Sequence, residues 1–167
     1  LDLNAYDWVH FEGRAIAELH DMLDVVARHP SLSTSLEVEK PREGIEALFH
    51  KADVLLFSYV YAMSRGFEDA NSLLNSLPAG SLATCSWGAQ GAWAIDEQPS
   101  ILYEPALHLD RIVDTLGAGD VFNAGVIDGL VRGLGLPQVL TRATRLAGHK
   151  CGRRGLSGLV DSARESG

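Results

Sequence analysis

Short runs of apolar residues alternate along this chain with segments in which apolar residues recur every three or four positions. A continuous apolar run such as 54–57 is typical of a strand buried on both faces. The spacing in 15–28 places apolar side chains on one side of a helix. The predicted strands are 8–11, 32–38, 54–57, 82–85, 92–95 and 101–103, and the predicted helices are 15–28, 44–49, 67–77, 121–131 and 137–150.

Strands and helices alternate at the spacing of βαβ units, which are right-handed and build a mostly parallel sheet with helices on both faces. The last two strands are close enough in sequence for a hairpin around residues 96–99. Ligands of such sheets bind outside the carboxyl ends of the strands. The pattern therefore predicts an α/β fold, and 167 residues are enough for one domain with a core of its own.

The stretch 112–123 is the one on which candidate chemistry converges. Its apolar pair Ile112-Val113 predicts the end of a strand, and a glycine-rich turn and a helix follow. The turn contains Gly117, Ala118 and Gly119, which we call the cradle. Glycine permits positive φ angles and lets an anion approach where a Cβ would block it. Because the first N–H groups of a helix lack partners and carry partial positive charge, the cradle predicts an anion site.

Asp120 follows the cradle directly. A carboxylate in the first turn of a helix is often only a cap that accepts hydrogen bonds from free N–H groups. Beside an anion site, however, a negative side chain would compete with a bound phosphate. A general base needs that position, since it takes the proton of the hydroxyl that attacks phosphorus. The combination favours phosphoryl transfer, with Asp120 as the base and as the residue that contacts the acceptor.

Four stretches of the chain resemble a known family. Residues 114–122, DTLGAGDVF, are similar to the D-T-x-G-A-G-D-x-F signature of the ribokinase (PfkB) family of carbohydrate kinases. Residues 8–14, 37–43 and 147–152 resemble the ketohexokinase (fructokinase) branch of that family. The similarity runs in order over nearly the whole chain and corresponds to the C-terminal half of the family's usual length.

The resemblance implies a ribokinase-like, three-layer αβα fold with a mostly parallel central sheet. Residues 1–167 would be the C-terminal part of a single kinase domain, and the N-terminal half, with most of the sugar site and the lid that mediates dimerisation, would be absent. The implied activity is transfer of the γ-phosphate of ATP to a primary hydroxyl, most simply fructose to fructose 1-phosphate. A full-length homodimer is implied, and the fragment alone is expected to be inactive.

The resemblance also assigns site residues. The N–H groups of the cradle would hold the γ-phosphoryl group, and Mg²⁺ would bridge the ATP phosphates with few protein ligands. A monovalent cation, K⁺, would lie beside the cradle, with Asp114 and the turn 152–158 as the candidates to hold it. The residues implied to contact the nucleotide are Trp87, Gly88, Ala89, Gln90, Gly91, Thr115, Gly117, Ala118, Gly119, Cys151 and Gly155.

Two parts of that assignment keep an alternative. A Gly-x-x-Gly sequence such as 88–91 is also the ordinary pattern of a plain turn. The apolar residues of 107–110 could line an adenine slot or belong to the core. In addition, many family members carry Asn-x-x-Glu after the strand at 54–57, whereas this chain has Ser58-Tyr59-Val60-Tyr61. Ketohexokinases also lack the motif, so its absence agrees with that branch.

Composition narrows the classes of partner. A formal net charge of −8 argues against nucleic acid or an anionic membrane surface as the main partner. No apolar stretch has the length of a membrane span and no secretory signal is visible, so a cytoplasmic location is expected. Cys85 and Cys151 have no metal-type spacing and are expected to be free thiols.

Two other functions are compatible with the same cradle. A catalytically silent nucleotide-binding or regulatory domain could keep the cradle, although it would have no need of a base at Asp120. A kinase for another sugar or for a nucleoside would use the same residues. A dinucleotide-binding Rossmann domain is not favoured, because its Gly-x-Gly-x-x-Gly follows the first strand rather than lying late in the chain.

Overall fold

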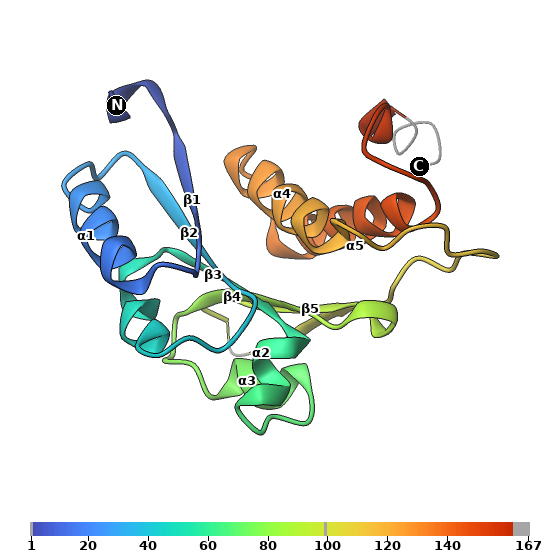
Figure 1. The fold of residues 1–167 in the computed structure, drawn as a ribbon, viewed down its shortest axis with the longest axis horizontal. Coiled ribbons are helices and arrows are strands. Elements are labelled where there is room, and N and C mark those ends of the chain that lie inside the picture. Colours follow the sequence, from blue (N-terminus) through green and yellow to red (C-terminus); the bar gives the residue numbers. More distant parts are fainter. Residues whose placement is uncertain (1, 99, 162–167) are drawn as a thin grey trace. The chain divides into compact units, whose positions relative to one another are not determined.

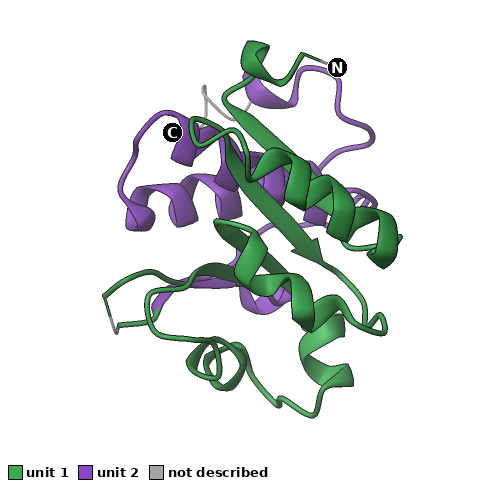
Figure 2. Ribbon diagram, turned by 90° about the vertical axis from the view of Figure 1, so that its left-hand side faces the viewer, with its two compact units in different colours: residues 1–85, 95–101 green, residues 86–94, 102–167 purple. Residues whose placement is uncertain are grey.

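The computed structural model describes residues 2–98 and 100–161, which fall into two compact units, Leu1–Cys85 with Ile95–Ile101 and Ser86–Ala94 with Leu102–Gly167 (Figure 2). The strands are β1 (Trp8–Glu12), β2 (Ser33–Val38), β3 (Val54–Ser58), β4 (Leu82–Ser86), β5 (Ala92–Ile95) and β6 (Leu102–Glu104). The α-helices are α1 (Ile16–Val26), α2 (Tyr59–Ser64), α3 (Ala70–Asn75), α4 (Ala118–Val131) and α5 (Leu136–Cys151). Three 3₁₀ helices complete the elements: η1 (Leu3–Ala5), η2 (Ile45–Lys51) and η3 (Gly88–Gln90).

The first unit is built on a parallel sheet. Its strands follow one another in the order β1-β2-β3-β4, and β2 pairs in parallel with both β1 and β3 (Figure 1). The register places Leu36 beside Phe11 on one side and beside Leu55 on the other. Leu36 is fully buried and β3 is buried along almost its whole length, as its continuous apolar run predicts. The mostly parallel α/β architecture expected from the sequence is confirmed.

In the first unit, the observed helices differ more from the sequence prediction than the strands do. No helix was predicted directly after β3, but Ser58 caps α2 by accepting a hydrogen bond from the Tyr61 N–H at 3.3 Å. The helix predicted over 67–77 is only α3, which begins after its cap, Asp69. The helix predicted over 44–49 is the 3₁₀ helix η2. Short segments such as these are decided by their caps and contacts rather than by apolar spacing.

The second unit consists of a hairpin and a pair of helices. Strands β5 and β6 are antiparallel, and the rings of their partner residues Trp93 and Tyr103 lie 4.6 Å apart. This confirms the hairpin, although residue 99 of its turn lies outside the described residues. Helices α4 and α5 pack side by side (Figure 1), joined by a turn in which Gly133 has φ +68°. Helix α5 also packs against β6.

Two glycines allow the close contact between α4 and α5. A Cβ at Gly125 would lie 2.9 Å from Ala143 Cα, and one at Gly129 would lie 2.9 Å from Val139 Cγ2. We therefore expect Gly125→Val to lower the free energy of unfolding by about 2 kcal/mol through overpacking. The neighbouring exposed residue gives a matched control, Ala124→Val, whose cost should be only the helix propensity of valine, about 0.5 kcal/mol. Equal midpoints of thermal or urea unfolding for the two variants would contradict this packing.

Both cysteines are free, as expected. Cys85 is buried in β4, and this burial raises the pKa of its thiol to about 12. Cys151 is half-buried at the end of α5. Among the residues that the structure describes, none of the helices combines the length and the hydropathy needed to cross a bilayer.

Candidate active site

The predicted turn and helix are present, and the predicted strand before them is not. Residues 107–115 have no regular secondary structure, and the side chains of Ile112 and Val113 are exposed. The backbone N–H of Val113 donates instead to the Cys151 carbonyl at 2.8 Å, and that of Asp114 donates to the same carbonyl at 3.2 Å. The end of α5, rather than a neighbouring strand, therefore fixes the chain that leads into the cradle.

The cradle forms the start of α4. Gly117 is the N-cap residue, with φ +77°, a left-handed conformation that side chains disfavour. The Ala118 N–H donates to the Thr115 carbonyl at 3.1 Å and closes the turn. Gly119 has no positive φ, so the expectation of left-handed backbone applies to Gly117 alone. At Gly119 a Cβ would meet nothing within 4 Å, so the packing of the chain itself does not require glycine there.

Asp120 lies exposed in the first turn of α4. Its carboxylate makes no hydrogen bond or ion pair with any other residue between 2 and 161 that the structure describes, and Gly117, not Asp120, is the cap. The Asp120 Oδ2 atom faces the turn, at 3.7 Å from where a Cβ on Gly117 would be. A free carboxylate next to a helix N-terminus is chemically able to accept a proton from a hydroxyl that is held there.

Asp114 anchors the turn from the other side. Its Oδ1 accepts a hydrogen bond from the Leu116 N–H at 2.9 Å, and its Oδ2 accepts one from Lys150 Nζ at 2.9 Å. The same ammonium donates to the Asp114 carbonyl oxygen at 3.0 Å. The Lys150 hydrogen bond, with a smaller contribution from the Leu116 N–H, holds the pKa of the Asp114 carboxyl below its usual value. The pair is therefore an ionised one.

Lys150 was not singled out in the sequence analysis. Its side chain is only 2% exposed, and it is the one buried lysine among the described residues. A signal for this was present: Lys150 follows Ala143 by seven positions and Ala147 by three, which continues the buried side of α5. Its partner could not be found in this way, because Asp114 lies far away in the sequence.

The loop 86–91 is folded as a closed turn. The Trp87 N–H donates to the Gly91 carbonyl at 2.8 Å, while the N–H groups of Gln90 and Gly91 donate to the carbonyls of Trp87 and Gly88. A Cβ on Gly91 would lie 2.1 Å from the Glu104 carbonyl oxygen, so glycine is required there by packing against β6. The donors that the turn leaves for a ligand are the N–H groups of Gly88 and Ala89.

The remaining predicted residues lie near the end of α5. Cys151 contributes the carbonyl described above, and the backbone of Gly155 lies close enough to the Asp114 carboxyl to make a small contribution to its lowered pKa. In the turn that follows α5, Arg153 donates to the carbonyls of Ser157 and Gly158. Thr115, Cys151 and Gly155 are thus brought together with the cradle, whereas the loop 86–91 contacts residues 103–106.

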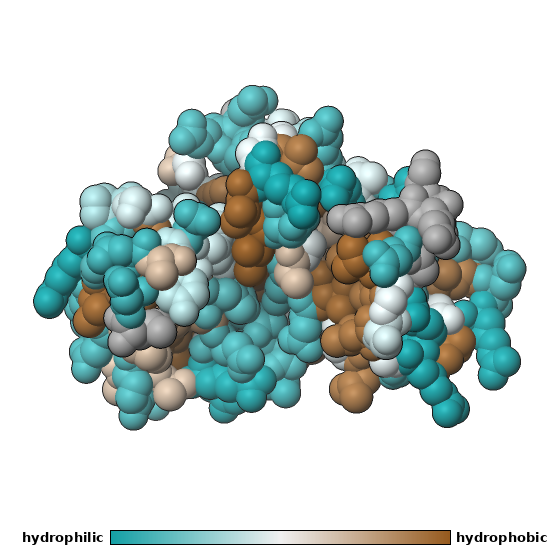
Figure 3. Space-filling model, turned by 90° about the horizontal axis from the view of Figure 1, so that it is seen from above, coloured by the Kyte–Doolittle hydropathy of each residue, from teal (hydrophilic) through white to brown (hydrophobic). Residues whose placement is uncertain are grey.

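Segment 107–110 packs on α5 rather than standing free. A Cβ on Gly148 would lie 2.4 Å from Leu107 Cβ, and one on Gly152 would lie 3.6 Å from Leu109 Cδ2. Leu107 and Leu109 are half-buried and do not belong to the buried core, so an adenine slot at this segment stays a prediction. Apolar side chains that are exposed lie around the cradle instead, above all Leu116 at 83% and Ile112 at 62%. Figure 3 shows in brown the hydrophobic residues that reach the surface on the face in view.

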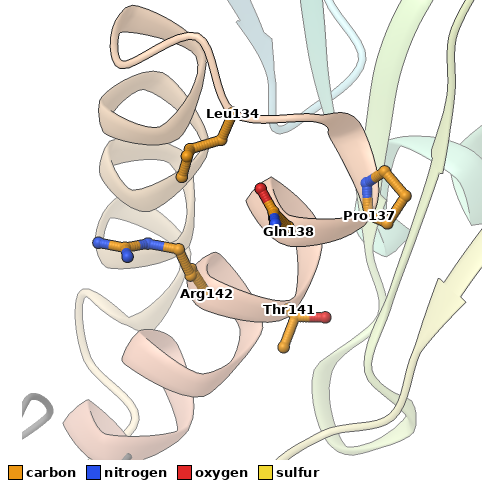
Figure 4. Close-up of a pocket in the computed structure, with 5 residues that line it drawn as sticks. All are labelled: Leu134, Pro137, Gln138, Thr141 and Arg142. Atoms are coloured by element: carbon orange, nitrogen blue, oxygen red, sulfur yellow. The ribbon is translucent and has the colours of Figure 1, made fainter.

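A shallow, open hollow lies elsewhere in this unit, between the turn after α4 and the first half of α5 (Figure 4). Its lining residues are Leu134, Pro137, Gln138, Thr141 and Arg142. Thr141 Oγ1 donates to Glu104 Oε2 at 2.7 Å, so one wall is tied to β6. The hollow is at the opposite end of α5 from Lys150 and Cys151 and includes none of the predicted site residues.

Solved structures define the class of fold. The chain superposes on a putative ribokinase from Agrobacterium tumefaciens with a TM-score of 0.82 and 21% identity, covering 99% of this chain and 57% of that one. It superposes on a ribokinase from Cryptococcus neoformans in complex with ADP with a TM-score of 0.79 and 16% identity, covering 99% and 62%. The fold is therefore the ribokinase-like α/β fold.

Sequence comparisons identify the family within this fold. The profile of the pfkB family carbohydrate kinases matches residues 12–163, and the chain belongs to this family. It is also 36% identical to the mouse (Mus musculus) ketohexokinase in an alignment of 171 positions that covers 96% of this chain. The chain spans 57% of the length of that ketohexokinase. It spans 57% of the Agrobacterium tumefaciens chain and 62% of the Cryptococcus neoformans chain.

Proposed function

We propose that this chain supplies the base and the phosphate cradle of an ATP-dependent sugar kinase, as the C-terminal part of a single kinase domain. The observation that supports this most strongly is the carboxylate of Asp120, which has no partner among the described residues and is exposed in the first turn of a helix that begins at a left-handed glycine. A silent nucleotide-binding domain gives no reason for a free carboxylate where an anion is to bind. The family to which the chain belongs supports the same reaction class.

In the proposed reaction, Asp120 accepts the proton of the acceptor's primary hydroxyl as its oxygen forms a bond to the γ-phosphorus and the bond from phosphorus to ADP breaks. The N–H groups at the start of α4 stabilise the charge that develops on the phosphoryl oxygens. Mg²⁺, when bound, neutralises charge on the ATP phosphates. Within the described residues no three His, Cys, Asp or Glu side chains cluster as a metal site.

The nucleotide contacts are proposed from both parts of the second unit. The N–H groups of Gly88 and Ala89 lie outside the hydrogen bonds that close the turn, and the side chains of Trp87 and Gln90 belong to the same proposed contact. Thr115, Cys151 and Gly155 would lie near the phosphates through their connection to Asp114. Similarity to a ribokinase solved with ADP supports an adenine nucleotide as the donor.

Fructose is the proposed acceptor, with its C1 hydroxyl as the nucleophile. The support is the 36% identity to mouse ketohexokinase, which is well above the identities to the solved ribokinases. An adenosine kinase from Sinorhizobium meliloti shares the fold with a TM-score of 0.80 at 22% identity, so a nucleoside is the competing acceptor. A cytoplasmic location and a homodimer belong to the same proposal.

The test is an ADP-release assay on the protein that carries this sequence, with fructose, ribose, glucose and adenosine offered at equal concentration. We expect ATP- and Mg²⁺-dependent turnover with fructose at a kcat/KM at least ~10-fold above the others, since pairing of hydroxyls discriminates strongly. Residues 1–167 alone, without a supplied N-terminal half, should give no sugar phosphorylation. Turnover with adenosine only would replace the proposed acceptor, and no turnover with any acceptor would favour the silent domain.

A further inference from the structure

We propose that the ε-ammonium of Lys150 occupies the cation position on Asp114 and thereby holds the cradle in shape for phosphate. Lys150 is thus a positioning residue, and Asp114 binds an internal ammonium rather than a K⁺ ion. The inference rests on the proposed function, because it assigns a role in the same site. It starts from the two hydrogen bonds that Lys150 makes to Asp114.

The donor set of Asp114 does not fit a metal ion. A monovalent cation would need oxygen ligands, and the two that face the interior, Oδ2 and the backbone carbonyl, both accept hydrogen bonds from Lys150 Nζ, at 2.9 and 3.0 Å. The third oxygen, Oδ1, accepts from the Leu116 N–H. A second cation placed on these atoms would be repelled by the ammonium at contact distance.

The surroundings of the Lys150 side chain suit a buried ammonium. The side chain is 2% exposed, and an ammonium buried to that extent is tolerated only when it is paired and hydrogen-bonded. Asp114 provides the pairing charge. Lys150 also lies in the last turn of α5, where the partial negative charge of the helix C-terminus favours a cation.

The consequence for the cradle follows the chain of hydrogen bonds. Lys150 donates hydrogen bonds to both the carboxylate and the carbonyl of Asp114. The Asp114 carboxylate in turn accepts a hydrogen bond from the Leu116 N–H. Within the turn, the Thr115 carbonyl accepts one from the Ala118 N–H. These bonds set the backbone immediately before Gly117. Without the ammonium, two oxygens of Asp114 lose the hydrogen bonds that Lys150 donates, and the turn keeps only its backbone bonds to the Cys151 carbonyl as a link to α5.

The experiment uses Lys150→Ala in the protein that carries this sequence, with added ethylammonium, K⁺ or tetramethylammonium chloride at equal ionic strength. We expect Lys150→Ala to weaken ADP binding ~10-fold or more, as the loss of supporting contacts does at other sites. Ethylammonium and K⁺ should restore ADP affinity and raise the melting temperature of the variant more than that of the wild type. Tetramethylammonium, which has no N–H to donate, should do neither.

Lys51→Ala serves as the matched control, since Lys51 forms an ion pair with Asp24 outside the site and should show no specific response to these ions. The double variant Lys150→Met with Asp114→Asn leaves no unpaired buried charge and gives the ADP measurement if the single variant does not fold. Unchanged ADP affinity in a folded variant, or equal ion responses in Lys150→Ala and wild type, would overturn the proposal. Failure of the kinase assay alone would refute the proposed function and leave the melting response to decide the role of Lys150.

Discussion

Asp120→Asn should lower kcat for sugar phosphorylation by at least ~100-fold while the affinity for ADP stays close to that of the wild type. Asparagine keeps the size of the side chain but cannot accept the proton of the attacking hydroxyl. Since no described residue depends on the Asp120 carboxylate for a hydrogen bond or an ion pair, the substitution should leave the fold intact. The measurement is a steady-state assay paired with calorimetry of ADP binding.

A matched control for this variant lies on the same helix. Asp128 is also exposed, but its carboxylate is paired with Arg132, with both oxygens 2.8 Å from Nε. Asp128→Asn should therefore leave kcat unchanged and cost only the small free energy of a surface ion pair, up to about 1 kcal/mol. Near-normal kcat in Asp120→Asn would remove the base assignment and leave Asp120 as a residue of the helix start only.

Gly119→Val should weaken ATP and ADP binding at least ~10-fold, which is about 1.4 kcal/mol, without unfolding the protein. Nothing in the chain lies within 4 Å of a Cβ at this position and its φ is not positive, so a side chain meets only the space in front of the helix N-terminus. If the phosphate binds there, valine excludes it. Gly117→Val should have the same effect with an added cost in stability, because of its φ of +77°.

The pair of glycine variants separates binding from folding. Circular dichroism and the melting temperature should show a destabilised Gly117→Val and a Gly119→Val similar to the wild type. Ala124→Val, exposed on the same helix, is the control for valine in α4 and should bind ADP normally. A folded Gly119→Val with unchanged nucleotide affinity would show that the phosphates bind elsewhere.

The parts that the sequence predicted are those in which neighbouring residues determine the structure. The buried strand at 54–57 and the helix at 15–28 follow from apolar spacing alone, and Gly117 is left-handed where the glycine-rich turn required it. The strand predicted to end at Ile112-Val113 is absent, because these residues bond to the Cys151 carbonyl and expose their side chains. The pattern of apolar residues around 112–113 gives no information on a hydrogen-bond partner that lies far away in the sequence.

Lys150 shows the same limit at the site. Its position on the buried side of α5 can be read from spacing, but its ion pair with Asp114 depends on how the end of α5 meets the turn. The family resemblance implied a phosphate loop at 86–91, and packing against Glu104 accounts for Gly91 without a ligand. Residue types identify candidates, whereas contacts between distant segments decide which of them are available to a substrate.

The most direct test of the proposed function is to follow the γ-phosphoryl group itself. The protein that carries this sequence is incubated with fructose, Mg²⁺ and ATP labelled at the γ-phosphate, and the product is identified by NMR. The proposal predicts that the label appears as a phosphate ester on the C1 oxygen of fructose, in amounts equal to the ADP formed. Label found only as inorganic phosphate, or left on ATP, would contradict it.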